Sequence, residues 1–229
     1  MNVSIIIPTF NEEQYIGRLL SRILSVRERE ELEVIVVDGG STDRTEEIVR
    51  GFPVRFEVVD RSRAVQMNAG ASLAKYDLLY FIHADTLPPN TFMEDISTSS
   101  KEGFEACCYR SKFERSRFLM KFNEFATRYE KLYCRGGDQS LAVSKQLFTE
   151  LGGFDESMEI MEEYPIIQQL MQRGKFHVIP KDILISSRKY DSNSWLKVSR
   201  ANLKAYRMYK RGEDSAKIKR TYREALNLA

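Results

Sequence analysis

Residues 3–38 read VSIIIPTFNEEQYIGRLLSRILSVREREELEVIVVD, and this stretch predicts a strand, a helix and a second strand. The runs at 3–8 and 33–38 are β-branched with almost no polar alternation, which is typical of strands covered on both faces. Between them Asn11 is a good helix N-cap, with Gln14 three residues further on. The apolar residues that follow at helical spacing are Ile16, Leu19, Leu20, Ile23 and Leu24.

The same alternation continues to residue 83 and predicts a mostly parallel α/β sheet with helices on both faces. The further elements expected are a helix from Ser41 or Asp43 to Gly51, a strand at 54–60, a helix at 64–74 and a strand at 77–83. In such sheets ligands collect at the carboxyl ends of the strands. Asp38 and Asp85 each follow a strand and should lie at that edge.

The second half of the chain is less regular and predicts an α+β continuation of the same sheet. Its expected elements are a strand at 105–113, a helix near 118–133, a Gly-Gly turn before 138–145, a short helix closed by Gly152 and Gly153, a helix near 161–173 and strands around 176–187. No repeat or low-complexity linker divides the chain, so we expect a single domain over 1–229 with a basic helical tail at 189–229.

Composition favours a globular protein, because 42% of the 229 residues are hydrophobic, enough for one sizeable core. Cys107, Cys108 and Cys134 lack metal-ligand spacing and are expected to be reduced, partly buried thiols of a cytosolic protein. The opening MNVSIII is interpreted as a first strand rather than a signal peptide, and no apolar stretch approaches the ~20 residues that span a bilayer. We therefore expect a cytoplasmic protein, at most peripheral to a membrane.

Positive charge is concentrated near the C-terminus, where residues 188–223 hold 12 Lys/Arg and 3 Asp/Glu, although the whole chain carries only +2. Residues 194–211 interleave these cations with aromatic and aliphatic side chains. Such a helix could lie on anionic lipid, pack on the core, pair with a second subunit in a homodimer, or cover a cleft as a lid. No helix-turn-helix, zinc or RNA-recognition pattern accompanies it, so no nucleic-acid partner is expected.

Asp38 stands in VVDGGSTD, at the end of a strand and before two glycines. A bound base or ribose could donate a hydrogen bond to its carboxylate. Alternatively, the run is a turn whose polar side chains satisfy local backbone groups.

His83 and Asp85 stand in YFIHADTLPP, residues 80–89, on the same side of an extended strand. Carboxylate oxygens suit Mg²⁺ or Mn²⁺, which typically bridge a protein carboxylate and substrate phosphates. The alternatives are that Asp85 caps the turn before the prolines, and that His83 is a buried histidine hydrogen-bonded to backbone.

Glu159, Glu162 and Glu163 precede an apolar helix in MEIMEEYP. Acidic residues in a first helical turn are explained by the helix macrodipole. A carboxylate held in a cleft could instead take a proton from a hydroxyl as a general base.

Taken together, five ordered motifs resemble the nucleotide-sugar glycosyltransferases of the GT-A fold, in particular the inverting enzymes of family 2. The motifs are SIIIPTFNEEQYI, VIVVDGGSTDRT, YFIHADTLPP, GGDQSLAVSKQLFTELGGFDE and MEEYPIIQQL, and they span 3–188 in the family's order. The chain looks most similar to a bacterial subgroup with HAD in place of Asp-x-Asp and QMNAG ahead of it. This resemblance implies a nucleotide-binding half at 1–100 and an acceptor and catalytic half at 101–188.

The resemblance also implies roles for particular residues. Asp85 would hold Mn²⁺ or Mg²⁺ on the donor diphosphate, with His83 in place of the family's first Asp. Glu163 would be the catalytic base, one methylene longer than the family's Asp, and Glu162 its acidic neighbour. The donor-site residues would be Pro8, Thr9, Glu12, Asp38, Arg63, Gln66, Asn68 and Ala84. Arg188 could reach the diphosphate or remain an exposed arginine at a strand end.

The implied function is inverting transfer of a sugar from a nucleoside diphosphate-sugar, UDP-linked in preference to GDP-linked, to an acceptor hydroxyl that the sequence does not identify. One alternative is a nucleotidyltransferase acting on sugar phosphates, which the acidic, glycine-free loop PTFNEEQ disfavours. The other is a catalytically degenerate protein that only binds a nucleotide-sugar.

Overall fold

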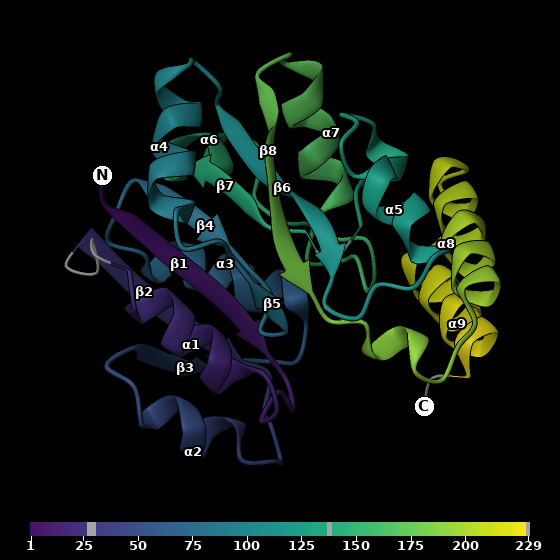
Figure 1. The fold of residues 1–229 in the computed structure, drawn as a ribbon, viewed down its shortest axis with the longest axis horizontal. Helices are drawn as coiled ribbons and strands as arrows, with labels where there is room; N and C mark the ends of the chain where they lie inside the picture. The colour runs from purple at the N-terminus through teal and green to yellow at the C-terminus, as the bar shows by residue number, and fades with distance from the viewer. Residues whose placement is uncertain (27–30, 137–138, 228–229) are drawn as a thin grey trace.

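An eight-stranded sheet forms the centre of the structure, a computed structural model that describes residues 1–26, 31–136 and 139–227 (Figure 1). The strands are β1 (Val3–Thr9), β2 (Leu32–Asp38), β3 (Arg55–Val58), β4 (Leu78–Phe81), β5 (Thr86–Leu87), β6 (Ala106–Phe113), β7 (Leu141–Ser144) and β8 (Phe176–Ile185). Their order is β3-β2-β1-β4-β7-β6-β8-β5. The first four strands are parallel, as are β6 and β8, whereas β7 and β5 run antiparallel to their neighbours. The predicted mostly parallel sheet is confirmed.

The helices match the predicted alternation, with differences in the second half. They are α1 (Ile16–Leu24), α2 (Thr45–Arg50), α3 (Arg63–Leu73), α4 (Phe92–Lys101), α5 (Met120–Ala126), α6 (Lys145–Glu150), α7 (Tyr164–Gln172), α8 (Trp195–Lys210) and α9 (Ser215–Leu226), with short 3₁₀ turns η2 (Leu132–Cys134) and η3 (Arg188–Tyr190). The helix expected near 118–133 is only α5, followed by η2. The predicted Gly-Gly turn includes Gly137 and adjoins Asp138, which lie outside the described residues.

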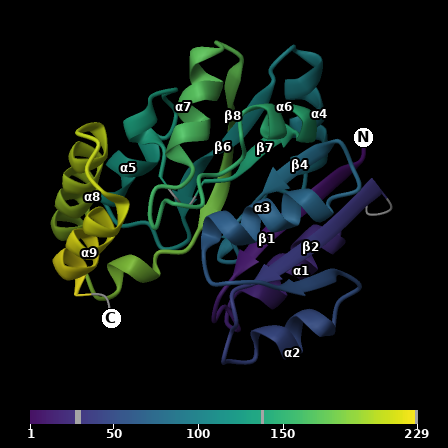
Figure 2. The same cartoon turned by 180° about the vertical axis from the view of Figure 1, so that it is seen from behind.

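Helices cover both faces of the sheet, because the strands bury residues on each side. In β1, Ile5 and Ile7 pack with α1 and α4 on the face seen in Figure 1. Ile6 packs with α3, α6 and α7 on the opposite face, seen in Figure 2. A Cβ at Gly70 of α3 would lie 2.4 Å from Cγ2 of Ile6, so glycine permits the close approach of this helix to the sheet.

The N-cap prediction for α1 is wrong. Asn11 has a left-handed backbone (φ 55°), and its side-chain Oδ1 accepts a hydrogen bond from the Thr42 backbone N at 2.8 Å. The helix begins later, after Tyr15, without a side-chain cap. Asn11 thus joins the loop after β1 to the loop after β2, and this places two strand-end loops side by side.

The basic tail packs on the rest of the protein through its apolar side. α8 and α9 lie against each other and, with α5, form the side of the molecule beyond β6 and β8 (Figures 1 and 2). Val198 and Ala201 of α8 join the core of the α1 face. Ala205 and Met208 pack instead with Met161, beside the start of α7. Packing on the core is therefore confirmed for the apolar side of this helix.

Within the described residues, no helix is both long enough and apolar enough to cross a bilayer. The three cysteines are buried and free, as the sequence predicts.

Candidate functional site

Two acidic side chains and one arginine meet at the carboxyl-terminal edge of the sheet. Glu12 follows β1, Asp85 follows β4 and Arg188 follows β8. Nη1 and Nη2 of Arg188 donate to the two carboxylate oxygens of Glu12 at 2.8 and 2.7 Å. The same Nη2 lies 3.0 Å from Oδ2 of Asp85. These three residues, here called the carboxylate cluster, come from three distant parts of the sequence.

The carboxylate cluster is partly shielded from water, with the side chains of Glu12 and Asp85 only 13% and 17% exposed. Burial raises the pKa of Glu12; the hydrogen bond and charge of Arg188 oppose this shift, and the charge of Asp85 adds to it. The Arg188 guanidinium also lies 5.1 Å from the centre of the Tyr15 ring. Among the three residues of the cluster, negative charge exceeds positive charge by one.

Asp38 is buried, and its carboxylate accepts four hydrogen bonds from residues of β1 and of the turn after β2. Its Oδ1 accepts from Oγ1 of Thr9 at 2.9 Å and from Oγ of Ser41 at 2.6 Å. Its Oδ2 accepts from the backbone N of Gly40 at 2.9 Å and of Ser41 at 2.6 Å. These contacts are those of the turn alternative. Recognition of a base by Asp38 stays a prediction.

Gln66 and Asn68 of α3 also bond to the protein itself. The buried Nε2 of Gln66 donates to the backbone O of Thr9 at 2.7 Å and of Val37 at 2.8 Å, which joins the ends of β1 and β2. Nδ2 of Asn68 donates to the backbone O of Phe154 at 2.8 Å, and its Oδ1 accepts from the Phe154 backbone N at 3.0 Å. In this structure both side chains hold α3 against neighbouring loops.

The other predicted donor-site residues lie at the same sheet edge. Pro8 and Thr9 end β1, and Ala84 is buried just after β4. His83 is partly buried, and its backbone O accepts from the Thr86 backbone N at 3.1 Å. Whether the His83 imidazole ligates a metal stays a prediction.

The predicted catalytic pair lies in the loop before α7. Glu162 is buried, and its Oε1 lies 2.8 Å from Nε of Arg63 at the start of α3. Glu163 occupies the N-cap position of α7 without a side-chain cap bond. Met161, immediately before them, has a left-handed backbone (φ 64°), which is uncommon for a bulky residue and occurs often at functional sites.

The residue after Glu163, Tyr164, lies beside the tail. Burial raises the pKa of Tyr164, and the negative charge of Glu163 raises it further. Burial also raises the pKa of Tyr209 in α8, with smaller contributions from the charges of Tyr206 and then Glu163. The rings of Tyr164, next to Glu163, and Tyr209 lie 5.2 Å apart, so the start of α7 packs against α8.

Sequence reasoning missed several side chains around these loops. The Arg61 guanidinium stacks on Phe10, 3.5 Å from the ring centre, between the loop after β1 and the loop before α3. Tyr15 and Tyr209 were not predicted as neighbours of charged groups. Nothing local in the sequence marks these contacts, because each joins residues from different elements.

A divalent cation at this edge would take ligands from a substrate and from water as well as from the protein. Among the described residues, no three His, Cys, Asp or Glu side chains gather into a metal site. Nevertheless, Oε1 of Glu12 and Oδ2 of Asp85 lie 2.7 and 3.0 Å from one nitrogen of Arg188, so two carboxylate oxygens already converge on one positive charge. This donor set fits a cation bound by one or two carboxylates together with phosphate oxygens.

Comparison with solved structures defines the fold class. S. aureus TarS residues 1–349 in complex with UDP match with a TM-score of 0.68 and 18% identity, over 99% of this chain and 71% of that chain. The mannosyltransferase PcManGT from Pyrobaculum calidifontis, in complex with GDP-Man and Mn²⁺, matches with a TM-score of 0.62 and 21% identity, over 87% of this chain and 61% of that chain. The predicted GT-A fold is confirmed.

Residues 4–149, more than half of the chain, match the family described as glycosyl transferase family 2, and the chain belongs to that family. The uncharacterized glycosyltransferase YkcC of Bacillus subtilis (strain 168) is 25% identical over 213 residues, which cover 86% of this chain and 65% of that protein. The chain thus spans less than two thirds of the length of this relative. The predicted family is confirmed, whereas the subgroup with HAD stays a prediction.

Proposed function

We propose that the chain transfers a sugar from a nucleoside diphosphate-sugar to an acceptor hydroxyl, with inversion at the anomeric carbon. The observation that carries this proposal is the carboxylate cluster at the carboxyl ends of β1, β4 and β8, the edge where ligands of such sheets bind. Family membership supports the reaction class. The UDP bound by TarS favours a UDP-sugar as the first donor to test.

In the proposed donor complex, Arg188 binds the diphosphate, because a guanidinium matches phosphate oxygens with two parallel N–H donors. Glu12, which holds Arg188 in this structure, accepts hydrogen bonds from the ribose hydroxyls. Asp85, with His83 beside it, would hold Mn²⁺ or Mg²⁺. When bound, such a cation would offset negative charge on the departing diphosphate.

The acceptor oxygen bonds to the anomeric carbon from the side opposite the diphosphate. The bond from that carbon to the diphosphate oxygen breaks, and its electron pair leaves with the nucleoside diphosphate. The carboxylate of Glu163 takes the proton of the acceptor hydroxyl. Glu162, fixed by Arg63, positions the loop that carries Glu163.

A thermal-shift series on the purified chain tests donor binding. UDP-sugars and GDP-sugars are compared with and without Mn²⁺, and a true donor should raise the unfolding temperature, because it binds only the folded state. UDP-sugars are expected to give the larger shift. If no nucleotide changes the unfolding temperature, the assignment of the donor site is wrong.

Donor turnover then distinguishes the reaction from binding alone. Slow hydrolysis of the donor in the presence of Mn²⁺, with the released sugar in the inverted anomeric form by NMR, is the expected result. Tight donor binding without any hydrolysis or transfer would instead support a protein that only binds a nucleotide-sugar. Release of pyrophosphate from a nucleoside triphosphate and a sugar phosphate would support a nucleotidyltransferase.

A further inference from the structure

We propose that the face formed by α5, α8 and α9 docks on the surface of a bilayer that contains anionic lipids. This face lies outside the carboxylate cluster, and the proposal does not depend on the transfer reaction. It rests on two surfaces, a cationic groove and an aromatic ridge.

The cationic groove lies between α8 and α9 and has a volume of about 550 Å³. Its lining includes Arg200, Lys204 and Arg207, at helical spacing on α8, and Arg211 at the C-cap of that helix, and all four are exposed. Within the described part of the chain, no ion pair joins any of these four to an acidic side chain. Glu213, the acidic side chain of the lining, pairs with Lys217 at 2.9 Å, so the groove presents a clear excess of positive charge.

The aromatic ridge is the exposed side of residues 118–133, around α5. Phe118, Phe122 and Phe125 are 77%, 60% and 52% exposed. Tyr129 and Tyr133 continue the ridge with 51% and 64% exposed. The rings of Phe118 and Phe122 lie 6.2 Å apart and those of Phe125 and Tyr129 lie 5.8 Å apart, so exposed aromatic side chains are grouped here, and such a group marks an interaction surface.

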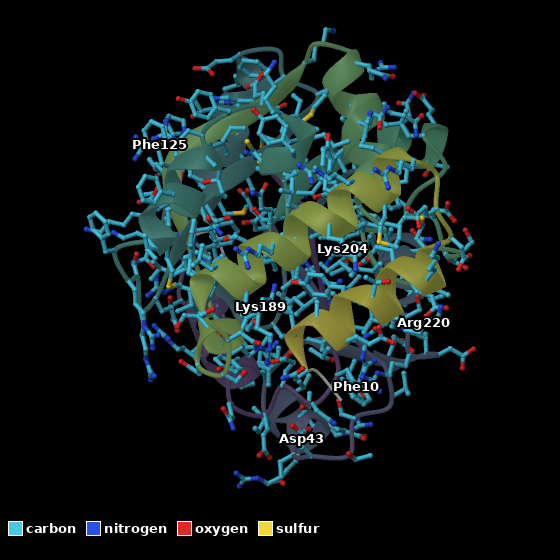
Figure 3. All side chains as sticks on the ribbon, turned by 90° about the vertical axis from the view of Figure 1, so that its right-hand side faces the viewer. Phe10, Asp43, Phe125, Lys189, Lys204 and Arg220 are labelled. Carbon is cyan, nitrogen blue, oxygen red and sulfur yellow. The ribbon has the colours of Figure 1, made fainter. Side chains whose placement is uncertain are left out.

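The ridge and the groove belong to one face of the molecule. The Phe122 ring lies 6.4 Å from the ring of Trp195, at the start of α8. Figure 3 views this face, with Phe125 at one edge, Lys204 on α8 in the middle and Arg220 on α9 beyond it. On α8 itself, Leu196 and Leu203 are 54% and 48% exposed between the cations.

This combination fits a lipid surface better than other occupants. Aromatic side chains insert at the boundary between headgroups and acyl chains, while Lys and Arg contact anionic headgroups. A second copy related by a two-fold axis would bring the same cations against themselves. An uncharged apolar partner would bury the cations without counter-charges, which is costly. Anionic headgroups supply the missing counter-charge.

Vesicle binding tests the proposal through Trp195, the single tryptophan of the chain. Vesicles of phosphatidylcholine alone are compared with vesicles that also contain phosphatidylglycerol. The expected result is co-sedimentation and a blue shift of Trp195 emission with the anionic vesicles only, both reversed by salt. Equal binding to the two vesicle types, or no binding to either, would overturn the proposal.

Two variants, each with its own control, localise the contact. Arg200→Gln, Lys204→Gln and Arg207→Gln together should weaken binding by about 100-fold, at about 1 kcal/mol for each cation near the surface. The control replaces Arg44, Arg50 and Arg55 with Gln, which removes the same charge from exposed arginines around α2 and β3. The control should bind anionic vesicles about as well as the unchanged chain. An equal loss in both would mean that net charge, not this face, governs binding.

The ridge variant combines Phe118→Ser with Phe125→Ser and leaves Phe122 in place beside Trp195. It should reduce vesicle binding and the blue shift, with the thermal transition unchanged, because both side chains are largely exposed. Val58→Ser, which replaces a residue 58% exposed on β3, is the control and should leave vesicle binding unchanged. A dimer that the ridge variant dissociates, in a chain that binds no vesicles, would assign the face to a second copy.

Discussion

Polar side chains near the predicted donor site are used in two opposite ways. The scaffold set, Asp38, Gln66 and Asn68, forms hydrogen bonds to the protein's own loops and strand ends. The charged set consists of the carboxylate cluster and Glu163. In the cluster, one guanidinium serves two carboxylates. A charged ligand can exchange for one of the ion pairs in the carboxylate cluster. To contact the scaffold set, a ligand would have to break hydrogen bonds that hold loops and strand ends together. Substitutions in the first set should therefore change stability, and those in the second should change activity.

The largest effect is expected at Glu163. Glu163→Gln keeps the shape of the side chain but removes its basic carboxylate, so the rate of transfer should fall by about 100- to 10,000-fold. Donor binding should persist, because the proposed donor contacts lie at the carboxylate cluster. Initial rates of donor consumption and the donor-induced thermal shift measure the two effects separately.

Glu159→Gln is the matched control in the same loop. This carboxylate is 49% exposed and pairs with Lys219, so its loss should leave turnover unchanged. Normal turnover in Glu163→Gln would contradict the assignment of Glu163 as the catalytic base.

Arg188→Gln is expected to weaken donor binding by about 10- to 100-fold, the range for hydrogen bonds to charged groups. It leaves Glu12 and Asp85 without their shared arginine, so added Mn²⁺ should recover part of the affinity. Titration of the donor with and without Mn²⁺ measures this difference. Arg18→Gln, which removes an arginine 59% exposed and paired with Glu114, is the control and should bind the donor normally. An unchanged donor affinity in Arg188→Gln would place Arg188 among the residues that only support the fold.

The fold was largely predictable because β1 and β2 are buried on both faces and the helices between strands carry regular apolar spacing. α4 was missed because Phe92–Lys101 is rich in Ser and Thr, which favour turns, and only its contact with the sheet makes it helical. β5 was missed because it has only two residues.

The position of Asp38 and Asp85 at one edge of the sheet was also predictable, since the ends of parallel strands share an edge. The partners of the side chains at this edge were not. Arg188 and Glu12 are 176 residues apart in sequence, and no local pattern indicates that they pair. Gln66 stands in a motif that implied a nucleotide contact, but its amide donates to main-chain oxygens of β1 and β2. Such contacts depend on tertiary geometry, which motif spacing does not encode.

Gln66→Ala tests the scaffold set. Gln66→Ala removes two buried hydrogen bonds to the main-chain oxygens of Thr9 and Val37, so the free energy of unfolding should fall by about 1–3 kcal/mol. Donor affinity, measured below the unfolding transition, should be unchanged. Gln146→Ala, in which the lost amide only reaches Glu150 at the surface, should affect neither quantity. A large loss of donor affinity with no loss of stability would instead mean that Gln66 contacts the donor.

The smallest effect is expected at Lys219, whose contact with Glu159 tests whether an exposed ion pair of this loop matters. Both side chains are substantially exposed, at 38% and 49%, so Lys219→Gln should change the free energy of unfolding by less than about 1 kcal/mol. In the same loop, Met161 belongs to one apolar cluster with Ile218, which is 1% exposed in α9. Ile218→Ala should therefore lower stability by about 2–5 kcal/mol, whereas Lys219→Gln leaves both turnover and the unfolding curve unchanged. If Lys219→Gln slowed transfer as strongly as Glu163→Gln, the comparison of the two sets would be wrong for this loop. An exposed ion pair outside both sets would then affect proton transfer to Glu163.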